Sequence, residues 1–312
     1  MTRQTQSSIK ASTTIAPATE ANLGIKALKG VRVLSLALNL PGPAALQRLR
    51  TMGANCTKLE PPGVGDPMAH YNTQAYGELH EGIKVLTADL KAPEGQRALH
   101  KALAKTDILL TSFRPAALKR LGLGWKELHK DYPGLSMVRV VGAPGPEADL
   151  AGHDLTYMAE AGLVPSLALP PTLYADMAGS LLASEAALQV MLRRQSSGKG
   201  SEMEVALSEA AQWLGLPRRW GMTQPKGVVG GAHAGYQVYA CIKGRVAVAA
   251  LEPHFAQRLC EAAGLRAGAH LKMTSPATRK ALESFFAGKS RREVDALAKA
   301  ADLPVHTLPP GR

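Results

Sequence analysis

The sequence predicts an α/β fold in which a doubly wound parallel sheet forms a large domain and a smaller α+β domain follows it. Three observations carry this prediction. Short β-branched and leucine-rich runs alternate with helical patterns up to about residue 215, which is typical of βαβ units. Residues 216–230 are rich in Pro, Gly and basic residues. Beyond them the sequence changes to a hairpin pattern followed by three helical stretches.

The large domain is expected to begin with a βαβ unit. Residues 31–37 are rich in Val and Leu, as in a strand buried on both faces. Pro41 breaks this strand, and Pro43 suits the first turn of a helix that ends near Gly53. A second strand follows at 56–60. The same alternation continues with strands at 85–90, 107–111, 135–141 and 202–207 and helices at 93–105, 176–194 and 208–215.

We divide the chain into four parts. Residues 1–27 are rich in Ser, Thr, Ala and Gln without a clear period, which predicts a flexible tail. Residues 28–195 form the large domain, 196–230 a linker region with one strand and one helix, and 231–312 the small domain. The small-domain patterns predict strands at 236–240 and 246–250, helices at about 253–264, 276–288 and 290–302, and a last strand in LPVHTL.

The composition is that of a basic globular protein. Of 312 residues, 46% are hydrophobic and 20% charged, which supports a packed core, and the formal net charge is +12. Such a charge favours anionic partners. The basic residues are scattered and aromatics make up 4%, so we expect a phosphate-bearing small molecule and no nucleic acid. No apolar run reaches the length of a membrane helix, so no membrane partner is expected.

The three cysteines are far apart in the sequence. Cys56, Cys241 and Cys260 match no disulfide framework and no metal-binding spacing. This usage favours a reduced, intracellular compartment, and we expect a cytoplasmic protein without a metal site.

Three polar residues stand out as candidates for chemistry. Asp176 opens the long helix, where the helix dipole favours an ionised carboxylate. Glu252 sits at another helix start, before Pro253. His153 follows a loop after a strand end, where α/β sheets place their ligands. Taken separately, each is more typical of a helix cap than of a catalytic group.

Six segments resemble, in the same order, the family III CoA-transferases, a family that includes the α-methylacyl-CoA racemases. They are GVRVLSLALNLPGPAALQRLRTMGANCTKLEPPGVGDP, LTADLKAPEGQRALHKALAKTDILLTSFRPAALKRLGLGWKEL, AGHDLTYMAEAG, YADMAGSLLASEAAL, GKGSEMEVALSEAA and VAVAALEPHF. The resemblance covers about residues 29–308. It implies that the large domain is Rossmann-like and binds CoA.

The resemblance implies catalytic roles for the three polar residues. In the transferases the aspartate that matches Asp176 is a nucleophile, and in the racemases it is an acid/base partner. The racemase branch adds a histidine and a glutamate, which match His153 and Glu252. Transferases carry a glutamine before the Gly-Pro turn, where this chain has Leu40 or Pro41. The resemblance therefore favours the racemase branch, with Leu40 in the substrate pocket.

The resemblance also implies a CoA-binding side. Arg114 and Arg120 match the CoA-side loop of the family, where phosphate contacts are expected. Lys84 is the one basic residue kept in a turn that is usually basic in the family. Asp154 is either structural or a contact to CoA. Tyr236 matches a pocket tyrosine of the racemases, and the alternative is an ordinary strand aromatic.

We therefore expect a racemase of 2-methylacyl-CoA thioesters that works by proton transfer. The CoA thioester is then the substrate, with no permanently bound cofactor. Asp176 and His153 would exchange a proton at opposite faces of the α-carbon, and Glu252 would orient His153. The alternatives are CoA transfer between carboxylic acids and a catalytically inactive CoA-binding relative. The family forms interlocked homodimers, and because this sequence ends at Arg312, earlier than the family does, we expect a homodimer whose interlocking is altered.

Overall fold

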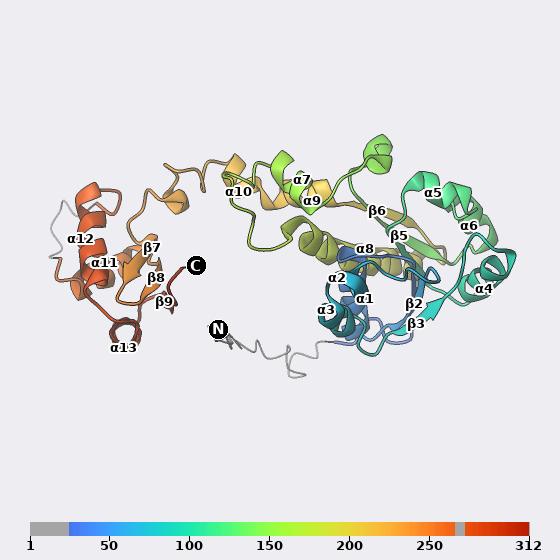
Figure 1. The fold of residues 1–312 in the computed structure, drawn as a ribbon, viewed down its shortest axis with the longest axis horizontal. Helices are drawn as coiled ribbons and strands as arrows, with labels where there is room; N and C mark the ends of the chain where they lie inside the picture. Colours follow the sequence, from blue (N-terminus) through green and yellow to red (C-terminus); the bar gives the residue numbers. More distant parts are fainter. Residues whose placement is uncertain (1–24, 266–271, 312) are drawn as a thin grey trace, which may run out of the picture. The chain divides into compact units, whose positions relative to one another are not determined.

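The structure is a computed structural model that describes residues 25–265 and 272–311 (Figure 1). The expected tail at 1–27 lies almost wholly outside the described residues. The chain divides after Gln212 into two compact units. No helix in the described part of the chain combines the length and the hydropathy that a bilayer-spanning segment requires.

The first unit is built on a six-stranded parallel sheet, which confirms the predicted α/β class. Its strand order is β3-β2-β1-β4-β5-β6, the order of a doubly wound Rossmann sheet. The strands are β1 (Arg32–Ser35), β2 (Asn55–Glu60), β3 (Lys84–Thr87), β4 (Ile108–Thr111), β5 (Ser136–Val141) and β6 (Glu202–Ala206). β6 comes from the region predicted as a linker, and it pairs with β5 throughout its length.

Two layers of helices cover this sheet (Figure 1). Side chains alternate between its faces, since Val33 and Ile108 belong to one buried cluster and Leu34 and Leu109 to another. The first cluster is completed by α1 and α8, the second by α4, α5 and α6. The bounds are α1 (Pro41–Thr51), α4 (Pro93–Leu103), α5 (Pro115–Arg120), α6 (Trp125–Asp131) and α8 (Tyr174–Ser197).

Several short helices were not predicted. They are α2 (Met68–Tyr71), α3 (Thr73–Leu79), α5 and α6. Each of these has at most seven residues, which is too short for a helical period to be read from the sequence. The helix start expected at His153 is that of α7 (Asp154–Glu160). The predicted 208–215 helix is α9 (Leu207–Leu214), and α10 (Leu216–Arg219) follows it.

An ion-pair cluster fastens the amino-terminal edge of the sheet. Asp107 accepts hydrogen bonds from Arg32 Nε at 2.9 Å and from Arg194 Nη1 at 2.8 Å. Burial raises the pKa of Asp107, but these hydrogen bonds outweigh it and lower the pKa to about 2. The cluster ties β1 to the last turns of α8, because Arg194 lies near the end of that helix.

The second unit contains a three-stranded antiparallel sheet of order β7-β8-β9. Its strands are β7 (Tyr236–Cys241), β8 (Gly244–Ala249) and β9 (Val305–Leu308), and its helices are α11 (Pro253–Ala262), α12 (Pro276–Ala287) and α13 (Arg291–Ala301). Val246, Leu282 and Phe286 form part of its buried core. The hairpin, the three helices and the last strand were all predicted, and the smaller α+β domain is confirmed.

Candidate active site

A cavity of about 270 Å³ opens at the carboxyl-terminal edge of the parallel sheet. Its wall includes Asn39 after β1, Ser112 after β4 and Gly142 after β5. The strand order reverses between β1 and β4. Open α/β sheets bind ligands at such a reversal, because the loops there diverge to opposite faces. The cavity is therefore where this fold is expected to place its chemistry.

Asp176 lines this cavity from the first turn of α8. Burial of its carboxyl group, together with the nearby charge of Asp154, raises the pKa of Asp176 to about 6. A carboxyl group with such a pKa exchanges its proton readily near neutral pH. This matches the function predicted for Asp176 better than a simple helix cap, whose carboxylate is usually held ionised.

Asp154 is buried beside Asp176. It is the first residue of α7, and its Oδ1 accepts a hydrogen bond from the backbone N–H of Asp176 at 3.0 Å. This bond joins the starts of α7 and α8. Of the two roles considered for Asp154, the geometry supports the structural one, and contact with CoA stays a prediction.

His153 lines the same cavity and precedes α7. The helix start is fastened by Thr156, whose Oγ1 accepts from the His153 backbone N–H at 3.1 Å and donates to the His153 carbonyl at 2.7 Å. These bonds use the backbone of His153. The exposed imidazole of His153 is therefore not needed to cap the helix. His153 lines the same cavity as Asp176.

Tyr157 is a cavity residue that the sequence reasoning missed. Its ring is buried against two glycines, because a Cβ at Gly142 or Gly152 would lie 2.1 Å or 2.5 Å from Tyr157 Oη. Burial and the nearby Asp176 charge raise the pKa of Tyr157. Gly152, directly before His153, was the only signal in the sequence that pointed to Tyr157. That glycine can be interpreted only once the Tyr157 ring is known to pack against it.

The predicted CoA-binding residues are distributed around the first unit. Arg114 lines the cavity and directly precedes α5, while Arg120 is exposed in the last turn of that helix. Lys84 is exposed at the start of β3. Leu40 is half-buried, and its neighbours Asn39 and Pro41 line the cavity. Phosphate contacts for Arg114, Arg120 and Lys84 stay predictions.

The other two predicted residues belong to the second unit. Glu252 is exposed directly before α11, as the sequence predicted. Tyr236 borders a separate, open, mainly apolar hollow of about 620 Å³, together with Gly231 and His306. The expected pairing of Glu252 with His153 stays a prediction.

The only cluster of potential metal ligands among the described residues is formed by Glu60, Asp66 and His80. Their ligand atoms surround the Nζ of Lys58, which contacts one atom of each residue. The ammonium group thus fills the position that a cation would take. A dication there would have to displace a fixed positive charge.

The sequence profile of CoA-transferase family III matches residues 28–309. A succinyl-CoA–D-citramalate CoA-transferase of Chloroflexus aurantiacus is 38% identical over 198 residues, which cover 58% of this chain and 49% of that protein. The α-methylacyl-CoA racemase of Homo sapiens is 27% identical over 289 residues, which cover 86% of this chain and 74% of the racemase. The chain therefore spans about half of the first relative and three-quarters of the second.

The fold also has solved counterparts. The hypothetical protein Rv3272 of Mycobacterium tuberculosis superimposes with a TM-score of 0.78 at 25% identity, covering 90% of this chain and 85% of that chain. A CaiB/BaiF family protein from Brucella suis superimposes with a TM-score of 0.74 at 22% identity, covering 89% of this chain and 82% of that chain. Because the Brucella suis protein is only 22% identical, this similarity concerns the fold alone.

Proposed function

The chain belongs to CoA-transferase family III, and on this premise we propose that it is an acyl-CoA enzyme that epimerises 2-methylacyl-CoA thioesters. The observation that carries the proposal is that two proton carriers, His153 and Asp176, line one cavity. The pKa of Asp176 is raised to about 6. Both its acid and its base form are therefore populated near neutral pH, as epimerisation in both directions requires.

The proposed reaction is a proton exchange at the α-carbon. One of the two residues removes the α-proton as a base, and the electron pair of the C–H bond passes into an enolate of the thioester. The other residue then donates its proton to the opposite face of the same carbon. No group is transferred and no oxidant is needed, because one proton leaves and one proton arrives.

The enolate requires stabilisation at its oxygen. The exposed guanidinium of Arg114 is the cation among the cavity residues. We assign it to the CoA phosphates, as the resemblance implies, and we assign Arg120 and Lys84 to the same anionic arm. Glu252 is proposed to orient His153, and Tyr236 and Leu40 to contact the acyl chain.

Deuterium exchange tests this function. A 2-methylacyl-CoA incubated in D₂O with the protein should gain deuterium at the α-carbon, detected by mass spectrometry. Loss of an acid or base typically costs about 10²–10⁴ in rate, so Asp176→Asn and His153→Ala should each fall by that factor. Glu160→Gln, an exposed acid at the end of α7, is the matched control and should exchange normally. Absence of exchange in folded protein that binds CoA would overturn the proposal.

A second candidate function is CoA transfer between carboxylic acids. It is favoured by the 38% identity to a CoA-transferase over 198 residues. In that case the Asp176 carboxylate attacks the thioester carbonyl, the CoA thiolate leaves, and an aspartyl anhydride forms. Hydroxylamine would trap this anhydride, and a free acid acceptor would be required for turnover. A racemase forms no anhydride and requires no free acid acceptor, so one set of assays distinguishes the two functions.

We also propose a homodimer in the cytoplasm. Light scattering after size-exclusion chromatography would give twice the monomer mass if the homodimer forms. A monomer in solution would contradict the proposed homodimer and would leave the proposed proton transfer at His153 and Asp176 unaffected.

A further inference from the structure

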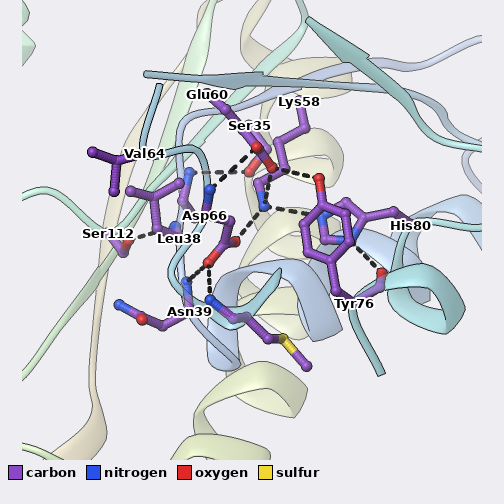
Figure 2. A network of polar contacts seen from close by, with 12 residues as sticks. Ser35, Leu38, Asn39, Lys58, Glu60, Val64, Asp66, Tyr76, His80 and Ser112 are labelled. Carbon is purple, nitrogen blue, oxygen red and sulfur yellow. Dashed lines mark hydrogen bonds and ion pairs between the residues drawn. The ribbon is translucent and has the colours of Figure 1, made fainter. Parts of the chain in front are cut away.

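A buried ionic cluster lies at the end of β2 (Figure 2). Its centre is Lys58, whose side chain is 0% exposed. Lys58 Nζ contacts Glu60 Oε1 at 2.9 Å, His80 Nε2 at 2.9 Å and Asp66 Oδ2. An ammonium group has three protons to donate, and here each has an acceptor.

The contacts of His80 determine its protonation state. Its Nδ1 lies 2.6 Å from the Tyr76 carbonyl, so this nitrogen carries the proton and Nε2 is free to accept from Lys58. Burial and the Lys58 charge lower the pKa of His80. The ring is therefore neutral, and it stacks on Tyr76, whose hydroxyl donates to Glu60 Oε1 at 2.9 Å.

The second oxygen of Asp66 points away from Lys58 and toward the backbone of Asn39 (Figure 2). Asp66 Oδ1 accepts from the backbone N–H of Asn39 at 2.9 Å and from that of Met68 at 3.0 Å. Asp66 is itself 0% exposed. Its carboxylate thus connects the buried ammonium to the backbone of the loop after β1.

That loop has an unusual backbone. Asn39 has φ of 65°, a left-handed conformation that L-residues adopt at a cost and that Asn tolerates better than most. Its neighbour Leu38 donates its N–H to Ser112 Oγ at 3.0 Å. The loop is therefore held by Ser112, which follows β4, on one side and by Asp66 on the other, and Leu38, Asn39 and Ser112 all line the cavity.

We propose that Lys58 and Asp66 form a positioning pair that holds the Leu38–Asn39 backbone in the shape that the cavity of Asp176 requires. The ammonium of Lys58 contacts Oδ2 of Asp66 and thereby orients the carboxylate. The charged oxygen then holds the Asn39 N–H in a charge-assisted hydrogen bond, which is stronger than a neutral one. The link to catalysis rests on the proposed function, whereas the effect on the loop does not.

Hydrogen–deuterium exchange of the free protein tests the positioning without any substrate. Asp66→Ala should raise amide exchange in residues 38–40 by about 10-fold or more, the scale of losing a hydrogen bond to a charged group. Asp66→Asn keeps one acceptor oxygen and should give an intermediate rate. Exchange in the core strand β5 should rise less, because it follows only the global loss of stability caused by leaving the buried Lys58 without this partner. Wild-type exchange at 38–40, or an equal rise throughout the unit, would overturn the proposal.

If Asp66→Ala does not fold, Asp66→Asn becomes the deciding variant. Its amide at Asn39 should still exchange several times faster than in the wild type, because a neutral acceptor replaces a charged one. Exchange at the wild-type rate in this variant would contradict the positioning role.

A double-mutant cycle separates positioning from mere stability. Glycine adopts a positive φ without cost, so in an Asn39→Gly background the loop depends less on Asp66. The loss in α-proton exchange caused by the Asp66 variant should then be several-fold smaller than in the wild-type background. An equal loss in both backgrounds would mean that Asp66 acts only through stability. If the wild type shows no α-proton exchange while the 38–40 amides respond as expected, the proposed function fails and the loop positioning stands.

Discussion

The backbone N–H of Asp176 donates a 3.0 Å hydrogen bond to Oδ1 of Asp154. Two carboxylic residues, 22 positions apart, therefore meet where α7 and α8 begin. Their proximity contributes to the high pKa of Asp176, after burial as the first cause. The proton affinity of the candidate catalytic group thus depends in part on Asp154, a residue that does not line the cavity.

Replacing Asp154 should lower the pKa of Asp176. Asp154→Asn removes the like charge and keeps an acceptor oxygen for the Asp176 N–H, while burial continues to raise the pKa. We expect a value between the ordinary 3.8 and about 6. Carboxyl ¹³C NMR titration would measure it. Glu185→Gln, an exposed change farther along α8, serves as the control, and an unchanged Asp176 pKa in Asp154→Asn would contradict the argument.

The activity should depend on pH through Asp176. With a pKa of about 6, its carboxyl group is mainly protonated below that pH and mainly ionised above it. Reactions in which Asp176 acts as base or nucleophile should therefore show kcat/KM rising with an apparent pKa near 6. A pH–rate profile checks this. A profile that stays flat from pH 5 to 7, with chemistry rate-limiting, would speak against Asp176 in either role.

The raised pKa of Asp176 also makes the free energy of unfolding depend on pH. This contribution to stability decreases as the pH rises, whereas the activity increases. A carboxyl whose pKa is raised in the folded state binds protons more tightly there than in the unfolded chain. Its contribution is present below the unfolded pKa near 3.8 and is lost as the pH rises through about 6. Asp176→Asn should therefore be more stable than the wild type at pH 7 and lose that advantage toward pH 4. Urea unfolding at both pH values measures the difference, and a constant difference would refute the linkage.

Removing Asp107 should destabilise the first unit. Its side chain is 10% exposed and pairs with Arg32 and Arg194, so Asp107→Ala leaves two cations without their partner. We expect a loss of about 2–3 kcal/mol, below the range for fully buried pairs because both arginines reach solvent. Glu94→Ala breaks the exposed pair with Arg97 and should cost less than about 0.5 kcal/mol. Equal losses of stability in Asp107→Ala and Glu94→Ala would contradict this prediction.

The Asp107 pair also has a defined pH window. Its pKa is about 2 in the folded protein against an ordinary 3.8. The stabilisation is therefore present above about pH 4 and is lost as the pH falls toward 2. Unfolding measurements on wild type and Asp107→Ala should converge in that range.

Gly152 should not tolerate a side chain. A Cβ there would lie 2.5 Å from Tyr157 Oη and 2.6 Å from Cε1, so Gly152→Ala must move the ring or the loop that carries His153. A displacement of about 1 Å can cost 10²-fold in rate, and we expect a fall of about that size in α-proton exchange. Gly77→Ala, whose Cβ would meet nothing within 4 Å, is the matched control. Wild-type activity in Gly152→Ala would show that Tyr157 has room to move.

Much of the fold could be predicted from local patterns. The β1–α1–β2 opening was visible because residues 31–37 are rich in Val and Leu and Pro41 ends the run. The close approach of α1 to the strand end was not visible. A Cβ at Gly42 would lie 2.2 Å from the Ala37 Cβ, so this glycine is required by packing that only the folded chain reveals.

The sequence by itself determined the α/β class, the order of its main elements and the candidates His153 and Asp176, because periodicity and helix starts are local properties. The tertiary structure decided which groups share an environment. It buried Asp154 against Asp176, enclosed Lys58 among three acceptors and set Asn39 on the carboxylate of Asp66. Desolvation and hydrogen bonding depend on which distant segments meet, and no local pattern contains that information.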